Sequence, residues 1–202
     1  MWESAAVETR SEGPWETLLP GELFHVPLCH VAARRDACVE LRISGALPDA
    51  WPLRLARGFA RRKISLCRGG ARAIEPGLWL ARLEVDLGPS GELPSDVLQL
   101  ALRPDGRAQL PEPPLLDFSL CASSVRGGRL ELEVHAWDAV GLLAAVLGRV
   151  EAAGLVPDEI LLETEGDCAF HQLVLRGRDG GAPAAIERAA LARSLSLLVR
   201  GR

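Results

Sequence analysis

Apolar and polar positions follow two distinct periods along the second half of the chain. Residues 130–134 alternate aliphatic and acidic side chains, which predicts a half-buried β-strand. Residues 142–150 carry aliphatic side chains at the three-and-four spacing of an amphipathic helix. The remaining predicted elements are two strands, a helix and a last strand, at residues 160–164, 168–175, 184–193 and 195–199. The predicted order is βαββαβ, the split unit of ferredoxin-like folds.

The first half repeats this pattern in a weaker form. A strand at 39–43 and an apolar helix face at 53–60 come first, and the later extended segments lie at 64–66, 72–74 and 78–87. The offset between the halves is about 90 residues, which indicates an internal duplication. We therefore predict an α+β protein of two tandem ferredoxin-like units. Their predicted bounds are 1–36 for an N-terminal extension, 37–127 for a diverged first unit and 128–202 for the second unit.

Two segments lie outside the repeated pattern. Residues 95–102 have helical spacing, and residues 115–125 return to strand-like composition before the predicted boundary at 126–128. Residues 1–36 have no counterpart in the repeat. They are either a flexible arm or a strand laid against the first unit.

The second unit combines a polar strand end, a glycine with two aliphatic residues opening a helix, a glycine ending that helix, and a strand closing on threonine. These positions are Asp138, Gly141, Leu142, Leu143, Gly154, Leu155, Ile160 and Thr164. In this pattern the unit resembles the ACT domain, a module that senses small molecules in many enzymes of amino-acid metabolism. The resemblance covers residues 129–201 and is strongest to ACT domains of protein-PII uridylyltransferases and phosphoglycerate dehydrogenases.

The resemblance implies a ligand site at the turn formed by Asp138, Ala139, Val140, Gly141 and Leu142. Free backbone N–H groups at a helix N-terminus attract a carboxylate, and glycine permits its close approach. Asp138 would face the ammonium group of an amino acid. The alternative is that Asp138 caps the helix and occupies the same N–H groups.

Two further positions bear on the ligand. Serine-binding relatives carry a polar amide where this chain has Val156, so the resemblance implies an apolar effector, a differently held one, or none. In the first unit, Pro52 follows residues 49–51 where the second unit has Gly141. Because proline lacks an N–H and glycine's conformational freedom, we predict that the first unit has lost this loop.

Composition and motifs argue against several other functions. A net charge of -4 argues against nucleic-acid binding, and no apolar run is long enough to predict a membrane span. The N-terminus lacks a signal-peptide pattern, which predicts a cytoplasmic location with reduced cysteines. Phosphate-binding, dinucleotide-binding and serine-nucleophile motifs are all missing. The scarcity of lysine and asparagine beside abundant arginine and alanine favours a bacterial source.

Histidines and cysteines offer the remaining candidate chemistry. His25, Cys29, His30 and Cys38 have ligand types that suit zinc. Their spacing matches no zinc motif and their alternating neighbours favour a strand, so no metal is predicted. His135 and His171 lie on strands predicted to be neighbours. We favour an exposed sheet face for this pair over a shared site.

These observations predict a non-enzymatic regulatory or sensor protein without catalytic residues or a cofactor. Its expected effector is a small metabolite, an amino acid, and its expected protein partner is a second copy or an enzyme. No nucleic acid or membrane partner is expected. The alternative is a ligand-free interaction or dimerisation module of a regulator of amino-acid or nitrogen metabolism.

Overall fold

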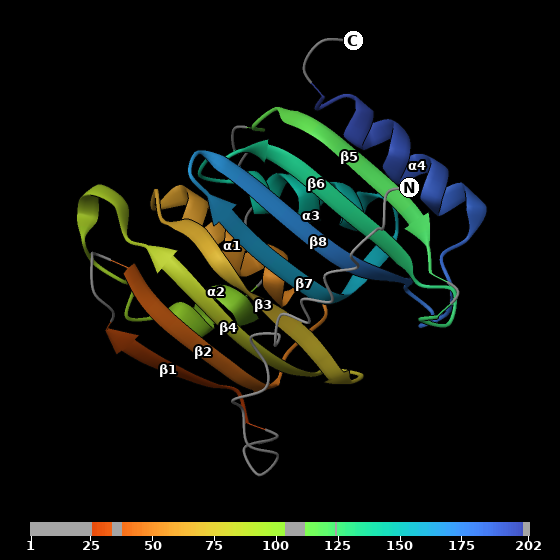
Figure 1. The fold of residues 1–202 in the computed structure, drawn as a ribbon. Coiled ribbons are helices and arrows are strands. Elements are labelled where there is room, and N and C mark those ends of the chain that lie inside the picture. Colours follow the sequence, from red (N-terminus) through yellow and green to blue (C-terminus); the bar gives the residue numbers. More distant parts are fainter. Residues whose placement is uncertain (1–25, 34–37, 104–111, 124, 200–202) are drawn as a thin grey trace, which may run out of the picture.

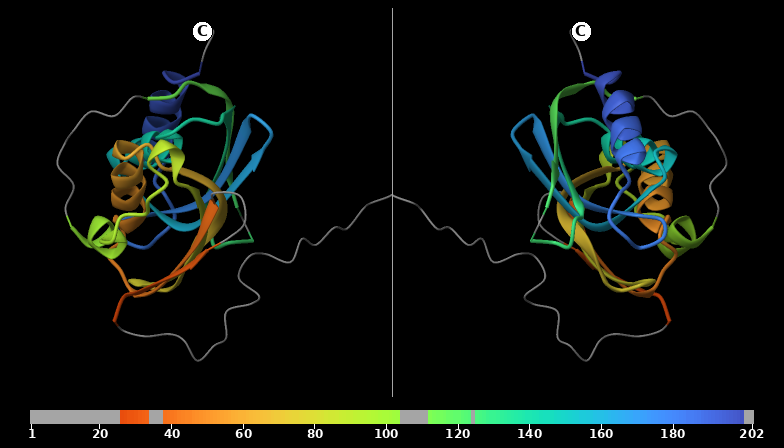
Figure 2. Two further views of the ribbon diagram at one scale, coloured as in Figure 1. Left: turned by 90° about the vertical axis from the view of Figure 1, so that its left-hand side faces the viewer. Right: turned by 90° about the vertical axis from the view of Figure 1, so that its right-hand side faces the viewer.

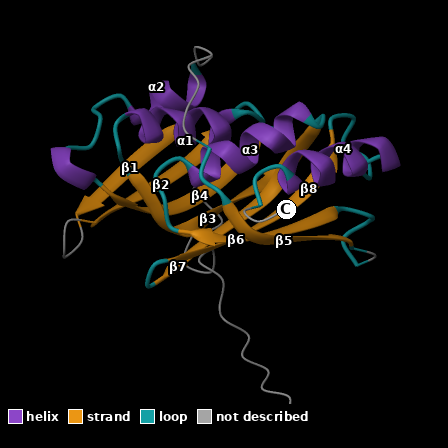
Figure 3. Ribbon diagram, turned by 90° about the horizontal axis from the view of Figure 1, so that it is seen from above, coloured by secondary structure: helices purple, strands orange, loops and turns teal. Residues whose placement is uncertain are grey.

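A computed structural model of the chain describes residues 26–33, 38–103, 112–123 and 125–199. In these ranges the protein is α+β, with one eight-stranded antiparallel sheet and four α-helices. The strand order is β1-β2-β4-β3-β7-β8-β6-β5, so each half of the chain forms one half of the sheet. All four helices cover the same face of the sheet, and no other described element covers the opposite face, which is called the open face below (Figure 2 and Figure 3). None of the described helices has the length and hydropathy needed to cross a membrane.

The two halves have the same element order (Figure 1). The first half contains β1 (Leu28–Ala33), β2 (Cys38–Ala46), α1 (Trp51–Arg61), β3 (Ser65–Glu75), β4 (Leu78–Asp86), a 3₁₀ turn (Gly88–Ser90) and α2 (Val97–Leu102). The second half contains β5 (Leu115–Ala122), β6 (Leu130–Trp137), α3 (Leu142–Ala152), β7 (Leu155–Glu165), β8 (Cys168–Gly177) and α4 (Ala185–Ser196).

The observed order in each half is ββαββα, so the predicted βαββαβ order is wrong at its last strand. The predicted strand at 195–199 begins inside α4, which keeps Leu191 and Leu195 fully buried against the sheet. Only Val199 makes an isolated bridge, to Leu115. The edge position beside β6 is filled instead by β5, which precedes the unit in the chain. In the same way β1 pairs with β2, which confirms the strand alternative for residues 28–33.

The periodic segments form the elements that their patterns predict. In β6 and β4 every second side chain is buried, because the helices cover one face of the sheet. Helix α1 buries Trp51, Leu55 and Phe59 on the face that meets the sheet. Tertiary burial of these stripes therefore determines where strands and helices form.

Strands β3 and β7 join the halves. Four residue pairs, from Gly69 with Leu162 to Arg72 with Glu159, connect the two strands antiparallel. Beside them the Arg68 guanidinium lies 2.8 Å from the Glu163 carboxylate. Helices α1 and α3 pack against each other above this seam. The loops that open the two helices consequently face the opposite half of the molecule.

Candidate functional site

The loop predicted as the ligand site lies between β6 and α3, at the seam with the first half. Asp138, Ala139, Gly141 and Leu142 line a cavity of about 20 Å³, whereas Val140 is 38% exposed and does not line it. Such a volume has room for about one water molecule, so this cavity is too small for an amino acid. The wall from the first half is formed by Ala56, Ile64, Ser65 and Leu66.

The N-terminus of α3 faces this cavity without a side-chain cap. Gly141 is the N-cap residue with a φ of 92°, a left-handed conformation that favours glycine. The N-cap residue makes no side-chain hydrogen bond to α3, and the Asp138 carboxylate accepts a hydrogen bond from the backbone N–H of Ala139 within the loop. Partial burial, with smaller effects from Asp86 and Asp167, raises the pKa of Asp138 above its usual value. The loop thus combines an uncapped helix terminus with a carboxylate in a locally acidic setting.

His171 forms part of the same cavity wall from β8. The side chain is almost fully buried, and its Nδ1 atom has no hydrogen-bond partner among the described residues. Burial lowers the pKa of His171 to about 4, so the imidazole is neutral near pH 7. An unpartnered nitrogen beside a water-sized cavity is a polar contact that one water molecule would satisfy.

A cavity of about 330 Å³ lies at the corresponding loop of the first half. Asp49, Ala50, Pro52 and Leu53 form one wall, where β2 runs into α1. The second half supplies the other wall, from the end of α3, the start of β7 and the segment after β8. The apolar residues of this second wall are Leu147, Val150, Leu155, Val156 and Pro157. This volume lies at the lower end of the range for small-molecule sites.

The first half keeps a segment before α1 that borders a cavity, but it lacks the left-handed glycine of the second loop: the N-cap residue Ala50 has a φ of -83°, whereas Gly141 has a φ of 92°. The predicted pairing of Pro52 with Gly141 is not the structural one. Helix α1 begins after the N-cap residue Ala50 and α3 begins after the N-cap residue Gly141, so Ala50 is the counterpart of Gly141. Pro52 stands inside the first turn of α1, where a missing N–H costs little. The proline lies in the first turn, after Trp51, and does not prevent the chain from forming a loop before α1.

Three charged side chains stand at the 330 Å³ cavity: Asp49, Glu151 and Arg178. Arg178 donates a hydrogen bond of 3.3 Å to the backbone carbonyl of Glu151, in the last turn of α3. Asp49 is half-buried, and its carboxylate lies 2.8 Å from the Arg176 guanidinium. The cavity thus has apolar walls and both signs of charge along its rim.

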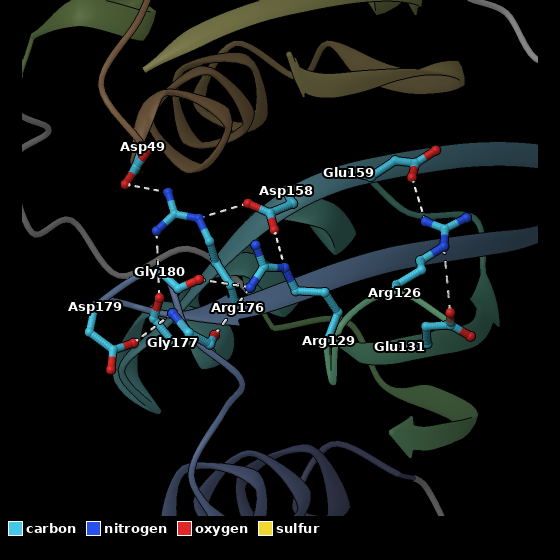
Figure 4. A network of polar contacts seen from close by, with 11 residues as sticks. Asp49, Arg126, Arg129, Glu131, Asp158, Glu159, Arg176, Gly177, Asp179 and Gly180 are labelled. Carbon is cyan, nitrogen blue, oxygen red and sulfur yellow. Dashed lines mark hydrogen bonds and ion pairs between the residues drawn. The ribbon is translucent and has the colours of Figure 1, made fainter. Parts of the chain in front are cut away.

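A chain of ion pairs runs from this rim into the second half (Figure 4). Arg176 bridges Asp49 and Asp158, at 2.8 Å and 2.7 Å. Asp158 in turn lies 2.7 Å from Arg129, which also donates to the carbonyl oxygen of Gly180. The chain links the Asp49 loop, β7, β8 and the β8–α4 connection, and thereby fixes the first-half loop against the second half.

Replacing Arg176 with methionine should lower the free energy of unfolding by about 2 kcal/mol, because Asp49 and Asp158 each lose a charged hydrogen-bond partner. The Arg176 side chain is only 12% exposed, so water replaces the guanidinium poorly. Arg126, which is 48% exposed, gives the matched control. Arg126→Met should cost less than about 1 kcal/mol, as exposed ion pairs do. Urea denaturation of both variants measures this difference, and equal losses would contradict it.

The histidines and cysteines singled out in the sequence form no common site among the described residues. His135 and His171 lie on neighbouring strands but on opposite faces of the sheet, because Val134 pairs with His171 and His135 pairs with Phe170. His135 is on the open face, with its ring 4.8 Å from that of Phe170, so the prediction of an exposed pair is correct for His135 alone. Cys29 and His30 are consecutive in β1 and point to opposite faces. His25 lies outside the described residues.

Sequence reasoning missed the residues of the larger cavity. Arg178 follows β8 in a segment whose sequence contains only turn signals, and Leu147 and Val150 read as ordinary core positions of a helix. Asp49 directly precedes Ala50, the N-cap residue of α1. Pairing Ala50 with Gly141 in the sequence would have identified the loop that contains Asp49. The contact between the halves then determines which of the two loops has space beside it.

Comparisons with known proteins identify no family. No family model matches the sequence, and no curated protein matches it. A solved structure, the crystal structure of aspartate kinase from Synechocystis, is similar over 80% of this chain and 27% of that chain. The sequence identity is 12% and the TM-score is 0.47. This chain thus spans about a quarter of that protein, and a likeness of this size assigns neither a family nor a function.

Proposed function

We propose that this chain is a non-catalytic regulatory protein that binds an amino acid at the seam between two ACT-like units. The observation that carries the proposal is the 330 Å³ cavity between the Asp49 loop and the second half. Ligand sites are concave, mostly apolar and provided with a few convergent polar groups, and this cavity has all three properties.

The position of the cavity supports a regulatory role. Its walls come from both halves, so a bound ligand would contact α1 on one side and α3 with β7 on the other. A ligand stabilises whichever arrangement of the halves it contacts best, because only differential affinity shifts a conformational equilibrium. The ion pairs of Asp49 with Arg176 and of Arg176 with Asp158 couple the same two parts.

The Asp138–Leu142 loop stays a predicted second site. Its uncapped helix terminus supports binding of a carboxylate there. Its cavity of about 20 Å³ requires the loop to open first. Different variants should therefore lose binding, depending on which of the two loops holds the ligand.

A thermal-shift screen of the twenty amino acids is expected to identify at least one that raises the melting temperature, because a ligand specific to the native state stabilises it. Val156→Trp fills the 330 Å³ cavity and should abolish this shift. Asp138→Ala should leave it unchanged. Loss of the shift in Asp138→Ala with retention in Val156→Trp would move the site to the predicted loop.

An interaction module is the second candidate function, and the open sheet face favours it. Trp137 is 51% exposed on this face, next to the half-buried Phe170 and Cys168. Exposed aromatic side chains on a sheet face are typical of protein contacts. If none of the twenty amino acids binds at millimolar concentration, the regulatory proposal is wrong and this candidate takes its place.

A further inference from the structure

We infer that the ligand of the 330 Å³ cavity is an α-amino acid with an apolar side chain, held at its carboxylate by Arg178 and at its ammonium by Asp49. The inference rests on the proposed function and names the class of ligand and the residues that recognise it. Three features of the cavity carry it: the chemistry of its walls, the spare donors of Arg178, and the balance of charge at its rim.

The walls select an apolar side chain. Leu147, Val150 and Leu155 are each at most 2% exposed, and they face Leu53 across the cavity. A hydroxyl, amide or charged group placed among these side chains would give up its bonds to water and find no partner on the aliphatic walls. An aliphatic or aromatic group would instead leave water for an apolar surface.

Arg178 has spare donors at the mouth of the cavity. Its one hydrogen bond in the described structure goes to the backbone carbonyl of Glu151. No carboxylate in the described part of the chain forms an ion pair with it. Because a guanidinium has five N–H donors in a planar arrangement, Arg178 can bind a carboxylate through two parallel hydrogen bonds while it keeps its hydrogen bond to the Glu151 carbonyl.

Charge at the rim is balanced in a way that suits a zwitterion. Arg176 and Arg129 form ion pairs with Asp49 and Asp158, whereas Arg178 contacts Glu151 only at its backbone carbonyl, so the two opposite charges of Arg178 and Glu151 balance without an ion pair. Asp49 is already held by Arg176, so its carboxylate is fixed in place to accept from an ammonium group. A dipolar ligand adds no net charge to this arrangement, whereas a simple carboxylic acid or an amine adds one.

Isothermal titration calorimetry on the full chain tests the assignment. The probes are L-leucine, L-isoleucine, L-valine, L-methionine and L-phenylalanine, with L-asparagine as a polar amino acid of size similar to leucine. We expect at least one apolar probe to bind at least about tenfold more tightly than asparagine, since burial of an unpaired amide opposes binding. The tightest apolar probe is then compared with its amide, which lacks the carboxylate and should bind at least about tenfold more weakly.

Arg178→Gln separates recognition from a structural role. Loss of the guanidinium should reduce the affinity for the amino acid by about tenfold or more and leave the affinity for its amide nearly unchanged, because only the former has a carboxylate to bind. Arg178→Lys should keep part of the preference for the amino acid. A variant that merely loosens the end of α3 would weaken both ligands equally, and this result would overturn the role of Arg178.

The remaining outcomes overturn other parts of the inference. Tighter binding of asparagine or of another polar amino acid would overturn the apolar class and leave the proposed function standing. An unchanged affinity in Asp49→Asn for the tightest probe would overturn the ammonium contact. Failure of all twenty amino acids to bind the parent protein would overturn both the inference and the proposed function.

Discussion

Lowering the pH from 7 to 4 is expected to reduce the free energy of unfolding by about 3 kcal/mol through His171 alone. Burial lowers the pKa of this histidine from 6.5 to about 4 in the folded protein. The unfolded chain therefore takes up a proton below pH 6.5 while the folded protein does not. The stability should be complete above pH 6.5, fall by about 1.4 kcal/mol for each pH unit below it, and level off below pH 4.

Urea denaturation at pH 7, 6, 5 and 4 measures this slope, and two variants assign it. His171→Leu removes the titrating group, so this part of the pH dependence should disappear and the stability difference between variant and parent should change by about 3 kcal/mol from pH 7 to pH 4. His135→Leu removes the histidine on the open face and should leave the slope as it is. A parent slope that persists in His171→Leu would show that other groups cause the loss.

Trp51→Ala is expected to lower the free energy of unfolding by about 3–5 kcal/mol, the cost of deleting a large buried aromatic side chain. Trp51 is fully buried at the first position of α1, and its ring meets that of Trp79 edge to face at 5.6 Å. At about 2–4 °C for each kcal/mol, the melting temperature should fall by about 10 °C. Calorimetric melting measures it.

Trp51→Phe is the matched control for this prediction. The indole Nε1 atom of Trp51 has no hydrogen-bond partner in the described structure, so phenylalanine keeps most of the packing and removes a buried donor without an acceptor. We expect a loss of less than about half that of Trp51→Ala. Equal losses would mean that a specific contact of the indole, rather than buried aromatic area, determines the stability of this loop.

The sequence predicts those parts of the fold in which a single face is buried. Strand β6 and helix α3 were both predicted, because alternating and three-and-four spacings distinguish a half-buried strand from a half-buried helix. The last strand was wrong because residues 195–199 form a leucine-rich run without either period. Such a run is compatible with a strand and with a helix, and the burial of Leu195 in the core stabilises helix α4.

The candidate site was only partly accessible to sequence reasoning. The family pattern located the loop before α3, and the structure places four of its five residues around one cavity. The size of that cavity does not follow from the loop. It depends on which residues of the other half face it: Ile64 and Leu66 leave about 20 Å³ at one loop, and Val156 with Pro157 leave about 330 Å³ at the other.

The unequal loops have a consequence for the shape of a binding curve. Two identical subunits joined through edges like those of β3 and β7 would present two seam cavities of the same size and would take up two ligands, the minimum number for cooperative binding. In this protein the two sides of the seam belong to one chain and have different sequences. One chain therefore has one ligand-sized seam cavity among its described residues, and a monomer that binds only at this cavity should take up a single ligand with a simple hyperbolic saturation curve.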